Sequence, residues 1–150
     1  IKLHCSLHET STEDKSYRLA FETAQAQNCP VLCHVYQGPS PEFLSGMLGD
    51  HPDMKFIYAH IGGGGKESLK PFVDVANARD NLFFDLGVSV MPRGTLAWLV
   101  EQAPPTQIVY GSDHPLNGFT FQLGRVLFAD IPDALKRMIL WENAARIFGV

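Results

Sequence analysis

The sequence lacks three features that would place it in a common class of protein. No apolar run approaches the roughly 18 residues of a membrane-spanning helix, so we expect no membrane partner. No charge of one sign dominates, because 12 basic and 16 acidic side chains leave a net charge of −4, and we expect no nucleic-acid partner. The three cysteines, an odd number, argue against a disulfide framework and favour a reducing, cytoplasmic location.

Short apolar runs recur at a regular interval along the 150 residues. The interval fits one strand, one helix and two short loops, which predicts repeated βα units. Strands joined through right-handed helical crossovers run parallel, so we expect an α/β fold with a buried parallel sheet. The expected strands cover residues 1–5, 30–35, 55–61, 81–87 and 107–113, and the expected helices cover 12–28, 40–48, 66–78, 92–102 and 131–150.

Local signals indicate where helices begin and end. Ser40 followed by Pro41 is typical of a helix start, and Gly149 is typical of a helix end. Ser11 or Thr12 is the expected N-cap of the first helix. The expected buried face of that helix consists of Leu19, Ala20, Phe21 and Ala24.

Polar side chains end three of the expected strands. His34 closes the second strand, His60 the third and Asp113 the fifth. Because the carboxyl ends of parallel strands lie on one side of a sheet, where α/β folds place their sites, we expect these side chains to converge. Alternation along each strand favours a shared face, and it groups His34 with Leu32, His60 with Phe56 and Tyr58, and Asp113 with Val109 and Gly111.

Further polar residues lie near the same strand ends. Lys2 and His4 on the first strand and Asp85 on the fourth occupy similar places, while His8 and His114 lie in loops just past strand ends. We expect these five side chains to line the pocket.

Imidazole groups beside a carboxylate suit a divalent metal such as zinc. A neutral histidine supplies a nitrogen lone pair and an aspartate supplies an anionic oxygen. A catalytic metal also keeps an open position for water and lowers its pKa towards about 7, and a second histidine or the aspartate then moves protons. The alternative is a set of buried polar groups whose hydrogen bonds are satisfied within the fold.

Four glycines follow His60 in the segment HIGGGGKES. The Walker-type phosphate loop requires G-x-x-x-x-G-K-[ST], and the match fails because Glu67 follows Gly65 and Lys66. A tight strand-to-helix turn is the favoured interpretation. A doubly wound domain that binds phosphate through the backbone N–H groups of Gly62–Gly65 stays open as an alternative.

Taken together, successive segments resemble the amidohydrolase-related family of metal-dependent TIM-barrel hydrolases, the branch that includes aminocarboxymuconate semialdehyde decarboxylase and several lactone hydrolases. The matching segments are PVLCHV, FIYAHIGGG, NLFFDLG, IVYGSDHP and ENAARIFGV, and IKLHC is similar to the family's fourth barrel strand. The resemblance covers essentially all 150 residues. It implies strands four to eight of a (β/α)₈ barrel.

The resemblance also implies roles for three residues. His34 corresponds to the metal ligand that ends the fifth barrel strand, and His60 corresponds to the catalytic acid/base or metal-proximal group of the sixth. Asp113 corresponds to the metal ligand of the eighth strand, which also takes part in proton transfer. The implied cofactor is a divalent metal, usually zinc and sometimes manganese, and the implied partner is a small-molecule substrate.

The H-x-H motif with which family members begin has no counterpart in this sequence. His4 and His8 are spaced H-x-x-x-H and stand in the position of the fourth strand. A (β/α)₈ barrel typically needs about 250 residues. We therefore expect residues 1–150 to be a partial TIM-barrel domain, completed by an N-terminal half upstream of Ile1 or by a second copy in a homo-oligomer.

The resemblance favours hydrolysis of a small lactone, amide or ester. In that reaction the metal polarises the carbonyl and activates water, Asp113 accepts the proton and His60 stabilises the oxyanion. Two alternatives stay open. One is decarboxylation of an aromatic or muconate-type acid on the same scaffold, and the other is a non-catalytic half-barrel that has lost its metal.

Overall fold

The computed structural model describes residues 1–34, 36, 38–61 and 65–150. Its five strands form a single sheet in the order β1-β2-β3-β4-β5, and the neighbouring strands pair in parallel. This confirms the predicted α/β fold of repeated βα units. Gly62–Gly64 of the alternative phosphate-binding turn lie outside the described residues, as does residue 35 at the end of an expected strand.

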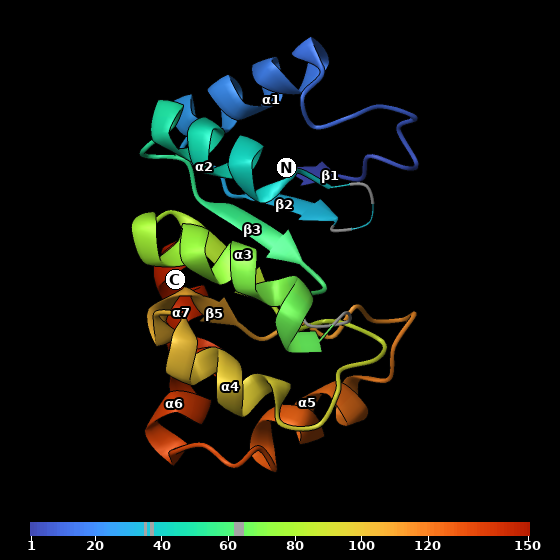
Figure 1. The fold of residues 1–150 in the computed structure, drawn as a ribbon, viewed down its shortest axis with the longest axis vertical. Coiled ribbons are helices and arrows are strands. Elements are labelled where there is room, and N and C mark those ends of the chain that lie inside the picture. Colours follow the sequence, from blue (N-terminus) through green and yellow to red (C-terminus); the bar gives the residue numbers. More distant parts are fainter. Residues whose placement is uncertain (35, 37, 62–64) are drawn as a thin grey trace.

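Strands and helices alternate along the chain, and the strands point in one direction (Figure 1). The elements are β1 (Lys2–Leu3), α1 (Lys15–Ala26), β2 (Val31–His34), α2 (Pro41–Asp50), β3 (Phe56–Ala59), α3 (Gly65–Ala78), β4 (Leu82–Asp85), α4 (Thr95–Gln102), a 3₁₀ turn η1 (Pro105–Gln107), β5 (Ile108–Val109), α5 (Phe119–Leu127), α6 (Asp133–Arg137), a π-helical segment η2 (Met138–Glu142) and α7 (Asn143–Phe148). None of the helices in the described part of the chain has the length and hydrophobicity needed to cross a membrane.

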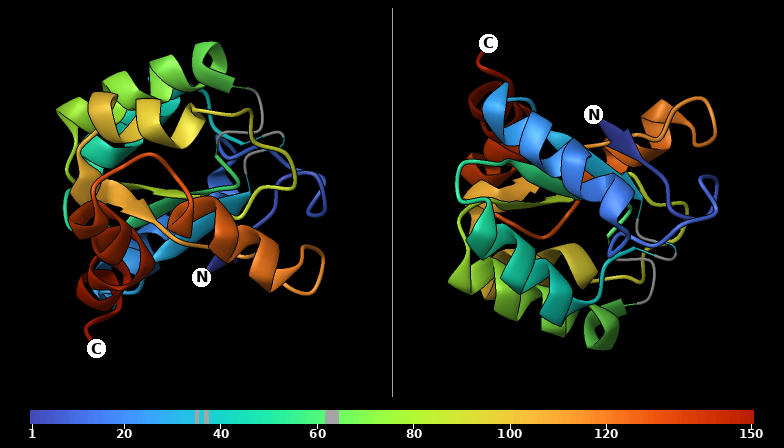
Figure 2. Two further views of the ribbon diagram at one scale, coloured as in Figure 1. Left: turned by 90° about the horizontal axis from the view of Figure 1, so that it is seen from below. Right: turned by 90° about the horizontal axis from the view of Figure 1, so that it is seen from above.

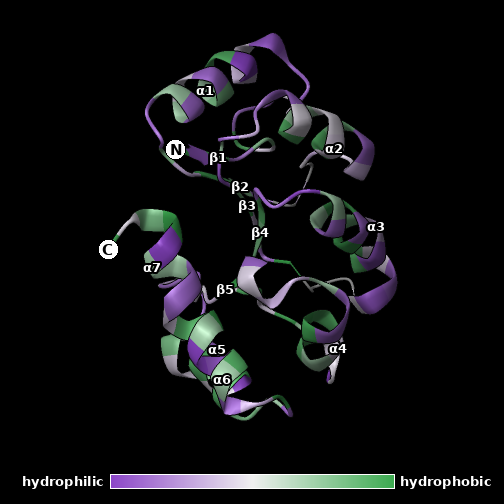
Figure 3. Ribbon diagram, turned by 90° about the vertical axis from the view of Figure 1, so that its left-hand side faces the viewer, coloured by the Kyte–Doolittle hydropathy of each residue, from purple (hydrophilic) through white to green (hydrophobic). Residues whose placement is uncertain are grey.

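The two faces of the sheet pack against different helices. Figures 2 and 3 show α2, α3 and α4 on one side of the sheet and α7 on the other. On the first side, strand residues such as Val31, Phe56 and Phe84 are fully buried in the main core. On the second side, Ile147 of α7 packs on a smaller apolar cluster made of Leu32, Ile57, Phe83 and Val109.

The N-cap predicted for α2 is correct, and the one predicted for α1 is wrong. Ser40 caps α2 as predicted, since its side chain accepts a hydrogen bond from the backbone N–H of Phe43 at 3.2 Å. The N-cap of α1 is Asp14, not the expected Ser11 or Thr12, and its carboxylate accepts from the backbone N–H of residue 16. The helix therefore begins later than predicted.

The buried face of α1 is also rotated relative to the prediction. Tyr17, Phe21 and Ala24 are buried, whereas Leu19 is 68% exposed. Tyr17 lies one turn before Phe21 and Ala24 lies one turn after it, so these three residues form a single stripe on a helix of 3.6 residues per turn.

Helix α5 is absent from the sequence-based prediction. Its buried residues Gln122 and Val126 lie four positions apart, as on a helix face, but one of them is polar. Phe119, Phe121 and Leu127 are exposed, at 50%, 59% and 44%. The apolar residues of this segment therefore do not coincide with its buried face.

Candidate active site

Three histidine rings from neighbouring strands gather at the carboxyl ends of the sheet. The rings of His4 and His34 stack, with centroids 3.9 Å apart and planes inclined by 11°. The rings of His34 and His60 meet edge to face, with centroids 4.7 Å apart. The chain therefore brings together side chains that lie on β2 and just after β1 and β3.

His60 reaches this cluster through an unusual backbone conformation, which corrects the expected alternation. Phe56 and Tyr58 face the helices in the main core, and a continued strand would have placed His60 with them. Instead β3 ends at Ala59, and His60 has a φ of 61°, in the left-handed region. This turn directs the ring towards His34, on the opposite face of the sheet.

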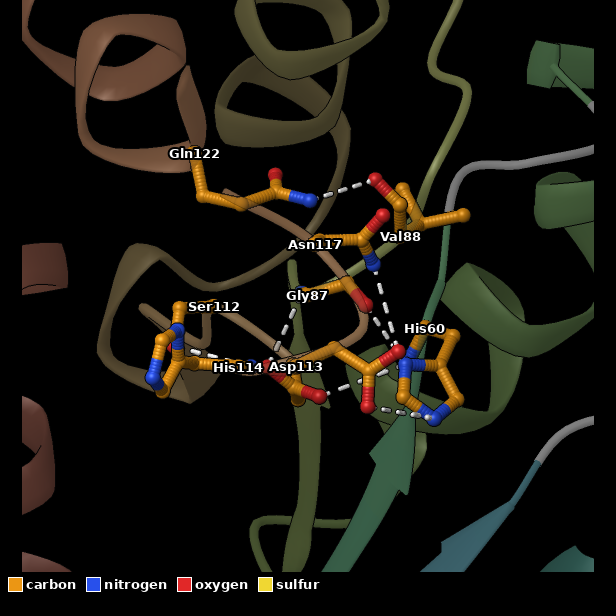
Figure 4. A network of polar contacts seen from close by, with 9 residues as sticks. His60, Gly87, Val88, Ser112, Asp113, His114, Asn117 and Gln122 are labelled. Atoms are coloured by element: carbon orange, nitrogen blue, oxygen red, sulfur yellow. Dashed lines mark hydrogen bonds and ion pairs between the residues drawn. The ribbon is translucent and has the colours of Figure 1, made fainter. Parts of the chain in front are cut away.

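Asp113 also adopts a left-handed conformation, with a φ of 53°. It lies beyond the end of β5, which stops at Val109 and is shorter than predicted. Its Oδ1 lies 4.0 Å from Nε2 of His60, and its Oδ2 accepts a hydrogen bond from Nδ2 of Asn117 at 3.2 Å (Figure 4). Such backbone conformations cost roughly 1–3 kcal/mol each and cluster at functional sites.

The hydrogen bonds of His60 determine which of its ring nitrogens carries the proton. Nδ1 lies 2.6 Å from the carbonyl oxygen of Gly87. A carbonyl only accepts, so Nδ1 is the donor and Nε2 of the neutral ring carries the lone pair. With a neutral ring, Nε2 and the Asp113 carboxylate are two acceptors that face each other across 4.0 Å, and with Nε2 protonated they form an ion pair.

His34 is held in its neutral form. Burial and the positive charges that His4, His60 and Lys2 can carry together lower the pKa of His34 to about 4, while Asp113 opposes this shift. A neutral imidazole is the form that binds metals.

Asp85 lies at the end of β4 with only 9% of its surface exposed. Burial raises the pKa of this carboxyl group, against the effect of hydrogen bonds from the backbone N–H groups of Gly87 and His60 and the charges of His60 and Lys2. Asp85 is therefore a buried acidic group that contacts the backbone of His60.

The remaining residues expected to line the pocket differ in their surroundings. His4 is half-buried and its Nδ1 lies 3.0 Å from Oγ of Ser6. Lys2 is exposed on β1, and its charge acts on His34 and Asp85. His8 is exposed and its Nδ1 lies 2.7 Å from Oη of Tyr17 on α1, while His114 is exposed in the loop after Asp113.

Helix α5 supplies residues that the sequence did not single out. Gln122 and Arg125 both donate to the carbonyl oxygen of Val88, and Arg125 also donates to that of Ser89 at 2.7 Å. These bonds fix the loop after β4, and this loop carries the carbonyl of Gly87 that orients His60 (Figure 4). No short motif marks these residues, because they act through backbone groups distant in sequence.

The donor set falls short of a complete metal centre. Among the described residues, no group of three or more His, Cys, Asp or Glu side chains is arranged to hold a metal ion. Imidazole and carboxylate groups are suitable ligands, but a catalytic zinc site usually has three protein ligands. The described residues alone therefore do not fit the metal that the sequence resemblance implies.

The model of the family described as amidohydrolase matches residues 1–150. The chain belongs to the amidohydrolase family. The comparison with curated proteins yields no match. The recognition from sequence motifs is thus confirmed over the whole chain.

Solved structures of similar fold place this amidohydrolase chain among TIM barrels. A TIM-barrel protein from Bordetella bronchiseptica is 20% identical, with a TM-score of 0.74 over 93% of this chain and 52% of its own. The 5-carboxyvanillate decarboxylase of Sphingomonas paucimobilis is 18% identical, with a TM-score of 0.67 over 93% and 55%. A dihydroxybenzoic acid decarboxylase from Polaromonas, determined with bound manganese, is 15% identical, with a TM-score of 0.69 over 93% and 55%.

These similarities show the fold, and the chain spans about half the length of these structural neighbours. The sheet of five parallel strands therefore corresponds to part of a TIM barrel. Active sites of TIM barrels lie at the carboxyl ends of the strands, which is where the cluster of histidines and Asp113 lies.

Proposed function

We propose that this amidohydrolase chain forms part of the active site of a hydrolase that cleaves a small lactone, amide or ester. The observation that carries the proposal is the pair formed by His60 and Asp113. Both residues hold left-handed backbone conformations, and they present Nε2 and Oδ1 to each other across 4.0 Å. Strain of this kind is retained where function requires it.

The pair can take a proton from water and return it to a leaving group. A water molecule that donates to Nε2 of His60 and to Oδ1 of Asp113 keeps its oxygen lone pairs free to attack a carbonyl carbon. Asp113 takes one proton of this water as the new C–O bond forms. Nε2 of His60 takes the second proton from the added hydroxyl group of the tetrahedral intermediate and donates it to the departing alkoxide or amine as the old bond breaks.

We further propose a divalent metal as cofactor, zinc or the manganese found in the Polaromonas enzyme. His34 and Asp113 are its ligands from this chain, and the neutral state of His34 supports that assignment. The other ligands and the remaining strands come from polypeptide outside the described residues, in the same chain or in a second copy. Analytical ultracentrifugation with and without zinc measures the oligomeric state and so tests for a second copy.

Decarboxylation of an aromatic acid is the second candidate. Its support is that two similar structures are those of decarboxylases of such acids. The same pair would then deliver a proton to the ring carbon that loses carbon dioxide. The third candidate, a non-catalytic half-barrel, is supported by the lack of a three-ligand group among the described residues.

Turnover assays separate these candidates. The complete protein that contains residues 1–150, loaded with zinc or manganese, is assayed against small lactones, esters and amides for acid release, and against hydroxybenzoates for carbon dioxide release. Asp113→Asn and His60→Gln must abolish the activity, while Asp74→Asn on the exposed surface of α3 must leave it intact. Carbon dioxide release alone would replace hydrolysis by decarboxylation, and no turnover with either metal would favour the half-barrel.

A further inference from the structure

A closed ring of hydrogen bonds joins Asp85, Gly87 and His60. Oδ1 of Asp85 accepts from the backbone N–H of Gly87 at 3.0 Å, and Oδ2 accepts from the backbone N–H of His60 at 3.4 Å. The carbonyl oxygen of Gly87 accepts from Nδ1 of His60 at 2.6 Å (Figure 4). The carboxylate therefore restrains both the backbone of His60 and the residue that orients its ring.

Two glycines leave the space in which this carboxylate lies. A Cβ added to Gly111, just after β5, would stand 1.7 Å from Oδ1 of Asp85. A Cβ added to Gly87 would stand 3.2 Å from the same atom. A side chain at residue 111 would displace the carboxylate. The Asp85 carboxylate therefore contacts the segments that follow β3, β4 and β5.

His60 needs such a restraint. Its left-handed backbone is unfavourable for a residue with a side chain, by roughly 1–2 kcal/mol. An extended backbone at this position would continue the alternation of β3 and move the ring towards the helices. The hydrogen bond to Asp85 opposes that change, because it is made by the N–H of His60 itself.

We propose that Asp85 is a positioning residue, which holds His60 in the conformation and the Nδ1–H tautomer that leave Nε2 free to face Asp113. The catalytic consequence rests on the proposed function, whereas the positioning is a property of the fold. The competing interpretation is that Asp85 only stabilises the loop after β4 and has no influence on His60.

Nitrogen NMR of the metal-free chain distinguishes the two interpretations. In ¹⁵N-histidine-labelled protein at alkaline pH, where histidines are neutral, the signals of His60 are assigned by their loss in His60→Gln. The unaltered chain must show the Nδ1–H tautomer, and an Nε2–H ring would overturn the proposal without any variant.

Asp85→Asn tests the carboxylate directly. Asparagine keeps one acceptor oxygen but turns an NH₂ group towards one of the two backbone donors, so we expect His60 to become a mixture of tautomers. The matched control is Asp74→Asn, whose carboxylate is exposed on α3. A folded Asp85→Asn chain with the original single tautomer would refute the proposal.

A second pair of variants covers the case in which Asp85→Asn fails to fold. Gly111→Ala keeps the carboxylate and displaces it, whereas a Cβ at Gly46 on α2 meets nothing within 4 Å. We expect the tautomer of His60 to change in Gly111→Ala and to persist in Gly46→Ala. An unchanged tautomer in a folded Gly111→Ala chain counts against the positioning role.

Kinetics separate failure of this inference from failure of the proposed function. In the active enzyme we expect Asp85→Asn to lower kcat by about 10-fold or more with little change in KM, as for residues that orient a catalytic group. Full kcat in this variant contradicts the inference and leaves the proposed hydrolase standing. A changed tautomer in a chain without any turnover supports the positioning and contradicts the proposed hydrolase.

Discussion

The two ends of the sheet use polar residues in opposite ways. At the amino ends, three buried side chains are neutral amides bonded to backbone carbonyls: Asn81 to Leu48 and His51, Gln107 to Arg79 and Leu82, and Asn143 to Pro105 and Ile108. At the carboxyl ends, the side chains are titratable, and Nε2 of His60 and the carboxylate of Asp113 face each other as acceptors. These three amides donate within the fold, whereas His60 and Asp113 present two acceptors to each other.

Polar residues at the two ends of the sheet therefore affect the stability of the fold differently. A buried amide whose two hydrogens are bonded stabilises the connections between elements at little risk, because it stays uncharged at all ordinary pH values. Left-handed backbone conformations cost free energy in residues with a side chain and cluster at functional sites. At the carboxyl ends, this cost falls on two titratable residues that face each other, His60 and Asp113.

The largest expected effect is on turnover. Asp113→Asn should lower kcat by about 10²–10⁴-fold, because a general acid–base group contributes that much. The free energy of unfolding should change little, because Asp113 is partly exposed and the amide can still accept from Asn117. Steady-state kinetics together with urea unfolding check both parts. If Asp113→Asn also lowered the free energy of unfolding substantially, its loss of activity would reflect unfolding, and the two ends of the sheet would not differ in this respect.

The second effect should appear at the amino end and in stability alone. Asn143→Leu removes two hydrogen bonds and leaves the carbonyls of Pro105 and Ile108 without this donor, which should lower the free energy of unfolding by about 2–3 kcal/mol. The control is Asn77→Leu on an exposed face, where one bond to the Gln102 carbonyl is lost and the expected change is much smaller. Equal losses in the two variants would argue against burial as the cause.

The third effect concerns a polar residue at the carboxyl end that we expect to serve stability and not the site. Ser40 caps α2 and is exposed, so Ser40→Ala should cost about 1 kcal/mol of stability and leave turnover unchanged. Ser40→Thr keeps the capping oxygen and serves as its control. A fall in kcat without a fall in thermal stability would assign Ser40 to the site.

The smallest effect concerns pH. The pKa of His34 is about 4 in the folded chain and near 6.5 in an unfolded chain. Between these values only the unfolded chain binds the proton, so the free energy of unfolding of the metal-free chain should fall as the pH falls from about 6.5 to about 4. The fall should be shallow because His34 is only half-buried.

Urea unfolding at a series of pH values, compared between the unaltered chain and His34→Asn, isolates this contribution. The slope between the two pKa values should be reduced in His34→Asn. Identical slopes would show that His34 titrates normally in the folded chain.

Much of the architecture could be predicted, because it depends on patterns within short segments. The interval between apolar runs predicts parallel strands joined by helices, and the sheet confirms it. The cap at Ser40 was also found, since a Ser-Pro pair acts locally. The prediction failed at α1, where Asp14 competes with nearby serine and threonine, and at α5, whose apolar residues do not coincide with its buried face.

The order of residues is enough to say which polar side chains end the strands and therefore which ones meet at one side of a parallel sheet. How they meet depends on the folded chain. His60 turns to the other face through its left-handed backbone, Gly87 selects its tautomer, and Asp85 lies in the space left by Gly111. The physical reason is that strand periodicity is local, whereas these contacts join residues about 25 positions apart, whose separation the folded chain alone defines.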